Sequence, residues 1–86
     1  MNFEFDPDKS KVNEAKHGID FVQAQLLWQD RWIEARLPFE GEDRFLVVGR
    51  IGKNYYSAIV TYRGDIIRII SVRRSRRNEK ELYDET

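Results

Sequence analysis

The pattern of apolar and polar positions predicts extended segments in the second half of the chain and helices near its start. The clearest segment is Ile66–Val72, where five aliphatic residues are interrupted only by Arg68 and Ser71. Both faces of such a strand are apolar, so we expect it near the middle of a sheet. The strand then runs into a cluster of arginines.

Four further segments have the composition of strands. The best of them places Phe45 and Val47 on one face and Leu46 and Val48 on the other. Short turns at residues 52–54 and 63–65 join consecutive strands, which predicts an antiparallel meander. The four segments are Phe3–Phe5, Trp32–Leu37, Arg44–Ile51 and Tyr55–Tyr62.

Helix signals flank these strands. Asp6 and Pro7 begin a helix that extends to about Lys16 and stops at His17-Gly18. A second helix begins at Asp20, with Gln23 completing a capping box, and it turns an apolar side to the core. That side consists of Phe21, Ala24, Leu27 and Trp28.

The chain ends in a third helix signal, with Ser75 as the expected N-cap of a helix over Arg76–Glu85. The predicted order is a strand, two helices, four strands and a final helix. We therefore predict a single α+β domain over residues 1–86, with an antiparallel four- to five-stranded sheet, two N-terminal helices and one C-terminal helix. We expect the helices to lie together on one face of the sheet.

Composition excludes several classes of site. The 86 residues contain no cysteine and one histidine, so disulfides and thiolate metal sites are excluded and a zinc site is not expected. No cofactor or metal is predicted. No apolar run is long enough to span a bilayer and no signal peptide opens the chain, so we expect a cytoplasmic protein.

The charge is unevenly distributed. Residues 63–77 contain six arginines and one acid, a local charge of +5, whereas the whole chain is neutral. Cations are unfavourable at a helix N-terminus, because that end carries a partial positive charge. Sequences often keep such an unfavourable arrangement where function requires it. The arginines therefore indicate either a phosphate site or a solvated basic turn balanced by the acids of the last helix.

The available side chains suit phosphodiester cleavage without a metal. RNA supplies its own nucleophile, the ribose 2′-hydroxyl, and arginines can stabilise the charge on the phosphorane. His17 is the one group whose ordinary pKa lies near neutrality, so it is the first candidate acid or base. Glu42, a lysine or a tyrosine could take that role instead, and His17 could merely end its helix by contacting the last carbonyls.

Three sequence elements resemble the BrnT family, the toxins of type II toxin–antitoxin pairs. They are FEFDPDK with Asn13 and KHGIDF, then GEDRF, and finally IRIISVRRSRRNEKELY, which cover most of the chain in order. The family usually has tryptophan where Phe5 stands. The resemblance implies a RelE-like ribonuclease fold, RNA as substrate, inhibition of growth and translation, and neutralisation by a BrnA-type antitoxin that supplies DNA binding.

The resemblance and the chemistry together give the candidate site. Arg68 interrupts an apolar strand and therefore needs a partner or access to the surface. The solvated alternatives are a loop ion pair for Glu42 and Arg44, and a hairpin tip for Arg63. The catalytic candidates are His17, Lys16, Glu42, Arg44, Arg68, Arg73 and Arg77, and the substrate-binding candidates are Arg63, Arg74 and Arg76.

Two other classes of function use the same basic edge. One is a noncatalytic nucleic-acid-binding module, and the other is an interaction protein that docks an acidic partner. RNA degradation in EDTA separates the ribonuclease from both, and salt-dependent RNA binding separates the two from each other.

Overall fold

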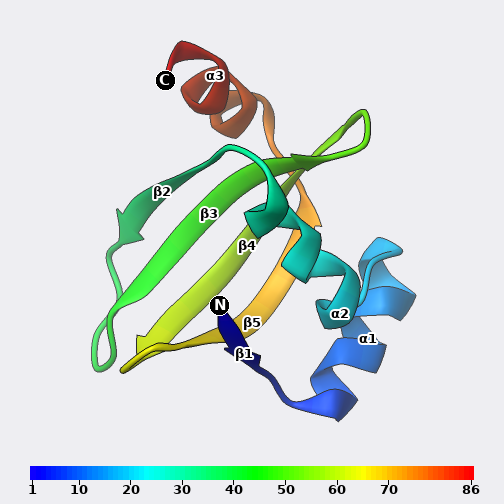
Figure 1. Ribbon diagram of the computed structural model, residues 1–86, viewed down its shortest axis with the longest axis vertical. Coiled ribbons are helices and arrows are strands. Elements are labelled where there is room, and N and C mark those ends of the chain that lie inside the picture. Colours follow the sequence, from blue (N-terminus) through cyan, green and yellow to red (C-terminus); the bar gives the residue numbers. More distant parts are fainter.

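The computed structural model describes residues 1–86 and has a five-stranded sheet with helices on both of its faces (Figure 1). The predicted α+β class and all five strands are confirmed. The strands are β1 (Asn2–Glu4), β2 (Trp32–Leu37), β3 (Arg44–Ile51), β4 (Asn54–Arg63) and β5 (Ile66–Arg74). The helices are α1 (Pro7–His17), α2 (Phe21–Ala24), the 3-10 helix η1 (Gln25–Gln29) and α3 (Arg77–Glu85). None of them is long and apolar enough to cross a lipid bilayer.

The sheet is mixed, so the expectation of an antiparallel sheet was wrong. Its order is β1-β5-β4-β3-β2, and β2 to β5 form the predicted meander. Strand β1 pairs parallel to β5, from Asn2 beside Ile66 to Glu4 beside Arg68. A parallel pair requires a long connection, and the chain between β1 and β5 contains all the other strands and the helices α1, α2 and η1. The interior position of β5 is confirmed.

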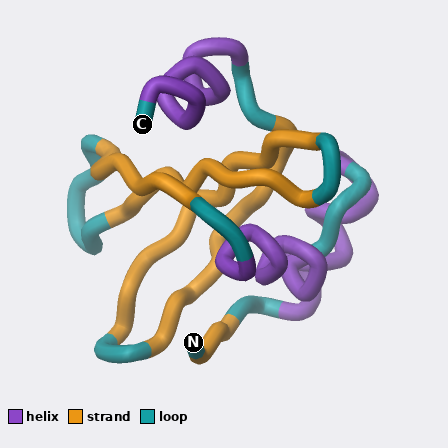
Figure 2. The backbone as a smooth tube through the Cα atoms, turned by 45° about the horizontal axis from the view of Figure 1, so that its top comes forward, coloured by secondary structure: helices purple, strands orange, loops and turns teal.

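The expectation that all helices share one face was also wrong. Helices α1 and α2 cover one face, whereas α3 lies at one end of the opposite face (Figure 2). The alternation in β3 explains this, because Val47 packs with α2 while Leu46 and Val48 point away from it. Tyr83 of α3 packs on Leu46 and Val48, so α3 buries the apolar side chains that α1 and α2 leave uncovered.

The predicted helix signals of the first half are confirmed. The Asp6 carboxylate accepts the Asp8 N–H at 2.9 Å, and Gly18 ends α1 with φ 74°, in the left-handed region. Asp20 and Gln23 form a reciprocal capping box. These two ends turn the chain sharply between α1 and α2, and the buried residues of the second helical segment follow the predicted spacing.

The expected N-cap at Ser75 was wrong. Arg76 occupies the N-cap position and α3 begins at Arg77. Ser75 still follows β5, because its N–H donates to the Tyr55 carbonyl at 3.0 Å and its buried hydroxyl lies 2.7 Å from Ser57 Oγ. A side chain committed to the sheet cannot cap the helix. The Arg76 N–H instead donates to Glu79 Oε1 at 2.8 Å.

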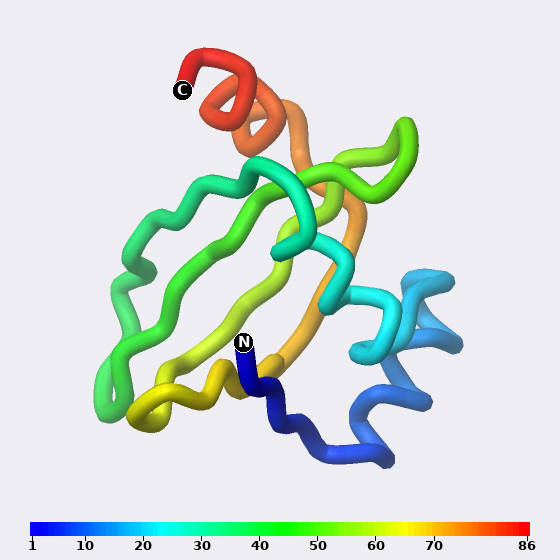
Figure 3. Tube along the Cα trace, viewed as in Figure 1, coloured from blue at the N-terminus to red at the C-terminus, as the bar shows by residue number.

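The outer edge of β5 is closed by two different elements along its length. Strand β1 runs beside only the first residues of β5 (Figure 3), and further along the side chain of Asn13 bonds its edge. Asn13 Nδ2 donates to the Val72 carbonyl at 2.8 Å, and Asn13 Oδ1 accepts the Val72 N–H at 3.2 Å. The same Nδ2 donates to the Ile19 carbonyl at 2.8 Å. Asn13 is buried, and it therefore fixes α1 beside β5.

Candidate active site

The pairing register places three polar side chains of β5 on the sheet face that carries Leu46, Val48 and Ile59, which we call the α3 face. Arg68 lies opposite Thr61, Ser71 opposite Ile59 and Arg73 opposite Ser57. Their neighbours Ile67, Ile69 and Val72 pack in the core on the other side. A register shift in β4–β5 pairing at Ile59/Val60 adjusts the alternation, so that residues 68, 71 and 73 share one face.

One row of side chains crosses the sheet on the α3 face. Arg68 stands between Thr61 and Glu4, and continuing the β3–β4 register by one residue places Arg44 beside Thr61. Arg68 Nη1 lies 2.6 Å from Glu4 Oε2, and Arg44 Nε lies 3.3 Å from Glu42 Oε2. We call Arg44, Thr61, Arg68 and Glu4 the arginine row. Its arginines are partly exposed, and each is held by one carboxylate.

A groove of about 240 Å³ separates α1 from the outer edge of β5, and we call it the α1–β5 groove. Lys16 and His17, at the end of α1, meet Ile70 and Ser71 of β5 there. Both Lys16 and His17 are exposed. Its other lining residues are Lys9, Val12 and Asn13. Segments from opposite ends of the chain therefore meet in this groove.

Arg73 is held firmly to α3. Its Nη1 and Nη2 donate to the two carboxylate oxygens of Glu79 at 2.7 and 2.9 Å. Glu79 also accepts the Ser57 hydroxyl and the Arg76 N–H, both at 2.8 Å, and its side chain is only 8% exposed. We call this set, Glu79 with Arg73, Ser57 and the Arg76 N–H, the Glu79 latch.

The latch sets the protonation state of its carboxylate. Burial by itself opposes ionisation of Glu79, but the hydrogen bonds from Arg73, Arg76 and Ser57 and the positive charge of Arg73 outweigh it. The pKa of Glu79 falls to about 2. The hydrogen bond to Glu79 raises the pKa of Arg73, against the effect of burial, so both partners remain charged.

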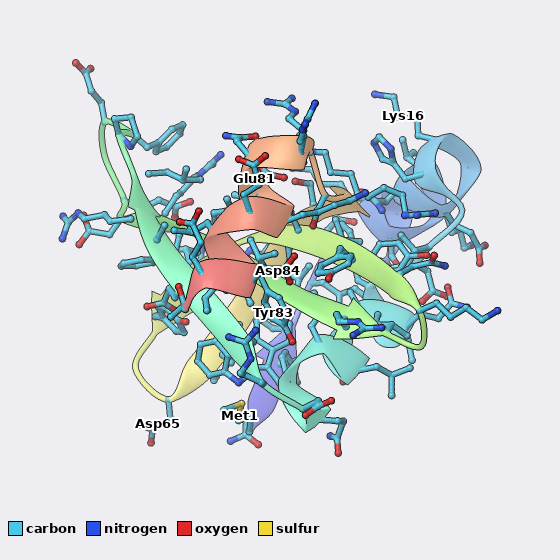
Figure 4. All side chains as sticks on the ribbon, turned by 90° about the horizontal axis from the view of Figure 1, so that it is seen from above. Met1, Lys16, Asp65, Glu81, Tyr83 and Asp84 are labelled. Carbon is cyan, nitrogen blue, oxygen red and sulfur yellow. The ribbon has the colours of Figure 1, made fainter.

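The remaining arginines near α3 are open to solvent. Arg77, whose side chain is 94% exposed, lies 3.4 Å from Glu81 one turn along the helix. Arg74 points to the other sheet face, where its guanidinium lies 5.6 Å from the centre of the Tyr56 ring. Arg76 is exposed beside it. Figure 4 looks onto this end of the molecule, with α3 nearest the viewer and Lys16 labelled on α1 farther back.

The predicted residues thus form two groups rather than one cluster. Arg68 lies between them on β5, and Arg63 lies 3.8 Å from Glu4 beside the arginine row. The group near α3 and the α1–β5 groove consists of Lys16, His17, Arg73, Arg74, Arg76 and Arg77. The group at the opposite end, beside the β2–β3 loop and the β4–β5 turn, consists of Glu42, Arg44 and Arg63.

Three residues that the structure places at the candidate site were not among the residues predicted from the sequence. Ser71 was noted only as a polar interruption of the strand, although a polar residue there must face a surface or a partner. Lys9 lies two helical turns before Lys16, so both share the groove side of α1. Glu79 stands three residues after the true N-cap, the spacing at which a carboxylate reaches the N-cap N–H.

These groups offer acid–base and anion-binding chemistry. No group of three histidine, cysteine, aspartate or glutamate side chains gathers closely enough to hold a metal ion. The groove instead offers an imidazole, two ammonium groups and a hydroxyl beside a strand that carries two arginines on one face. Such a set can bind a phosphate and exchange protons with it.

Comparison with known proteins identifies the family. No protein with a curated description matches the chain. The family model for the ribonuclease toxin, BrnT, of type II toxin–antitoxin systems matches residues 5–79. That span includes β2 to β5, both N-terminal helical segments and the first residues of α3. The chain therefore belongs to the BrnT family of ribonuclease toxins of type II toxin–antitoxin systems.

Proposed function

We propose that the protein is a metal-independent endoribonuclease whose reaction takes place where the α1–β5 groove meets the α3 face. The observation that carries this proposal is the position of Ser71. It lines the groove with Lys16 and His17, and it stands between Arg68 and Arg73 on the same face of β5. The two arginine Cα atoms are roughly 16 Å apart along the strand, so their long side chains can approach one phosphate from both sides.

The reaction follows from these positions. The ribose 2′-oxygen attacks the phosphorus, its proton passes to the base, and the 5′-oxygen leaves with a proton from the acid. Neutral His17 serves as the base and Lys16 as the acid, whereas Glu42, the other base predicted from the sequence, lies at the opposite end of the sheet and does not act in this groove. The products are an RNA end with a 2′,3′-cyclic phosphate and an RNA end with a 5′-hydroxyl.

The arginines stabilise the charge that develops on the phosphorane. Arg73 donates from Nη1 and Nη2 to Glu79 and from Nη1 also to the Arg74 carbonyl, which leaves at least two of the roughly five N–H donors of a guanidinium for a phosphate. A donor fixed before the reaction stabilises charge without reorganising. Arg68 and Arg44 extend the same face, Arg77 acts with Arg73 as the resemblance implies, and Arg63, Arg74 and Arg76 bind RNA phosphates farther from the cleaved bond.

As a type II toxin the protein has an antitoxin partner. We propose that this partner is of the BrnA type, that it binds DNA for the complex, and that the complex forms in the cytoplasm. Inhibition should bury or ion-pair Arg73 or Arg77, because a basic surface is silenced by an acidic or apolar segment laid over it. The α+β arrangement is also consistent with the RelE-like ribonuclease fold that the resemblance implies.

Cleavage of RNA by the purified protein in EDTA tests the proposal. His17→Ala and Lys16→Ala should each reduce the rate by about 10²–10⁴, the range for loss of a general acid or base. Lys53→Ala, in the exposed β3–β4 turn, is the matched control and should retain the parental rate. Salt-dependent RNA binding without any cleavage would instead favour a noncatalytic nucleic-acid-binding module.

A further inference from the structure

The largest cavity of the molecule is not used by the proposed chemistry. It has a volume of about 610 Å³ and lies at the end of the sheet farthest from α3, between the β2–β3 loop and the β4–β5 turn. Side chains from both sheet faces line it, because it wraps around the ends of β3 and β4. The lining side chains that could contact a ligand are Glu42, Asp43, Phe45, Thr61, Tyr62 and Arg63.

Two aromatic rings form one wall of the cavity. The Phe45 and Tyr62 ring centroids are 5.3 Å apart, with the planes inclined at 56°. The Tyr62 hydroxyl donates to Glu34 across the sheet, which fixes the ring, and Tyr62 remains 37% exposed. Burial and that hydrogen bond raise the pKa of Tyr62, so the ring stays neutral. A fixed, neutral, partly exposed ring is a suitable platform for stacking a nucleobase.

Each of the two carboxylates in the cavity has one oxygen without a hydrogen-bond partner. Asp43 is held by Arg36, whose guanidinium donates to its Oδ1. Glu42 contacts Arg44 through Oε2 at 3.3 Å, a longer and weaker contact than the 2.5 Å between Arg36 and Asp43, so Glu42 is the carboxylate that can turn both of its oxygens toward a ligand. The Watson–Crick edge of guanine presents two neighbouring donors, whereas adenine, cytosine and uracil place an acceptor beside each donor. A carboxylate pairs with two donors and is repelled by an acceptor, so Glu42 favours guanine.

Thr61 connects the cavity to the proposed reaction site. It lines the cavity, and it also lies between Arg44 and Arg68 in the arginine row. Arg63, whose side chain is 57% exposed, adds a cation at the rim. A phosphate held by this row would therefore leave the base of the same strand at the mouth of the cavity. We propose that the cavity is a guanine-binding subsite that gives the toxin a preference in its RNA substrate, an inference that rests on the proposed function.

Nucleotide binding can be measured without any cleavage. Titration of ¹⁵N-labelled protein with the 5′-monophosphates of guanosine, adenosine, cytidine and uridine should move the amide signals of Gly41, Thr61 and Arg63. Guanosine monophosphate should bind about tenfold more tightly than the other three. Glu42→Gln should remove that preference, because an amide offers a donor as well as an acceptor. Glu40→Gln changes a neighbouring exposed carboxylate outside the cavity and should retain it.

Tyr62→Ala should weaken the binding of all four nucleotides, whereas Tyr62→Phe should keep it, since the ring rather than the hydroxyl carries the stacking. Equal affinity for the four nucleotides, or signals that move only around His17, would overturn the subsite. Guanine-selective binding by a protein that cleaves no RNA would preserve the subsite and refute the proposed function. Cleavage of RNA without guanine-selective binding would preserve the proposed function and refute the subsite.

Discussion

The α3 face contains two kinds of arginine–glutamate pair, and they differ in burial and in the number of partners. In the Glu79 latch the carboxylate is 8% exposed and accepts four hydrogen bonds, two of them from Arg73. In the arginine row Arg68 and Glu4 are about one-third exposed, at 30% and 32%, and share a single hydrogen bond. Arginine and glutamate thus form one largely buried pair and one pair that is partly exposed to solvent.

This difference in burial gives the two arginine–glutamate pairs different roles. A buried pair with every oxygen bonded costs a great deal to break, because removal of one partner leaves a buried charge alone. A pair that is partly exposed to solvent contributes about 0–1 kcal/mol to the free energy of unfolding, and its arginine can exchange the carboxylate for another anion at little cost. The latch therefore holds α3 on the sheet, while the arginine row can exchange Glu4 or Glu42 for another anion, which in the proposed function is an RNA phosphate.

The largest expected effect on stability is that of Glu79→Ala. It leaves Arg73 and Ser57 without their buried acceptor, so the free energy of unfolding should fall by about 3–5 kcal/mol. Urea denaturation followed by circular dichroism measures it. Glu4→Ala, the matched change in the arginine row, should cost less than about 1 kcal/mol. Equal losses in the two variants would show that burial does not distinguish the latch from the row.

Arg68→Ala should affect the reaction more than the fold. Loss of one charge-stabilising donor typically lowers the rate by about 10²–10³, whereas the unfolding free energy should change little because the pair with Glu4 is about one-third exposed, at 30% and 32%. Single-turnover cleavage of a short RNA measures the first quantity and urea denaturation the second. Arg36→Ala removes a 68% exposed arginine that also has one acidic partner and serves as the control. An active Arg68→Ala variant would remove the arginine row from the reaction.

The latch should also make the fold sensitive to acid. Because the pKa of Glu79 is lowered from 4.5 to about 2 in the folded protein, the unfolded chain binds its proton first as the pH falls. The stabilisation is fully present above pH 4.5, and about 3 kcal/mol is lost between roughly pH 4.5 and 2. Urea midpoints measured across this range should show that loss in the parent and a smaller one in Glu79→Gln. Parallel curves for the two proteins would contradict the assigned pKa.

Local signals in the sequence predicted the elements well but not their relations in space. The caps at Asp6, Gly18 and Asp20 were predicted because each depends on residues within four positions. The parallel pairing of β1 with β5 joins residues 64 positions apart, and no local pattern specifies it. Ser75 was misassigned for a similar reason, since its hydroxyl bonds Ser57 across the sheet.

The candidate site was predicted in the same partial way. The composition and the family motifs selected the arginines and His17, but only the fold shows that Lys16 and His17 lie beside Ser71 while Arg44 lies in the row with Arg68. A charge count cannot separate the latch from the row either, because burial and the number of partners are tertiary properties.

The smallest expected effect on stability is that of Arg77→Ala. Its pair with Glu81 is at helical spacing and almost fully exposed, so the change should cost no more than about 0.5 kcal/mol. The resemblance to the family nevertheless implies that Arg77 acts with Arg73 in the proposed site, and we expect Arg77→Ala and Arg73→Ala each to abolish growth inhibition. Arg73→Ala breaks the latch as well, so only Arg77 separates contact with RNA from support of the fold. Growth of cells that express each variant without antitoxin, with the melting temperatures of the purified proteins, tests this. An Arg77→Ala variant as toxic as the parent would confine the reaction to the α1–β5 groove and the arginine row.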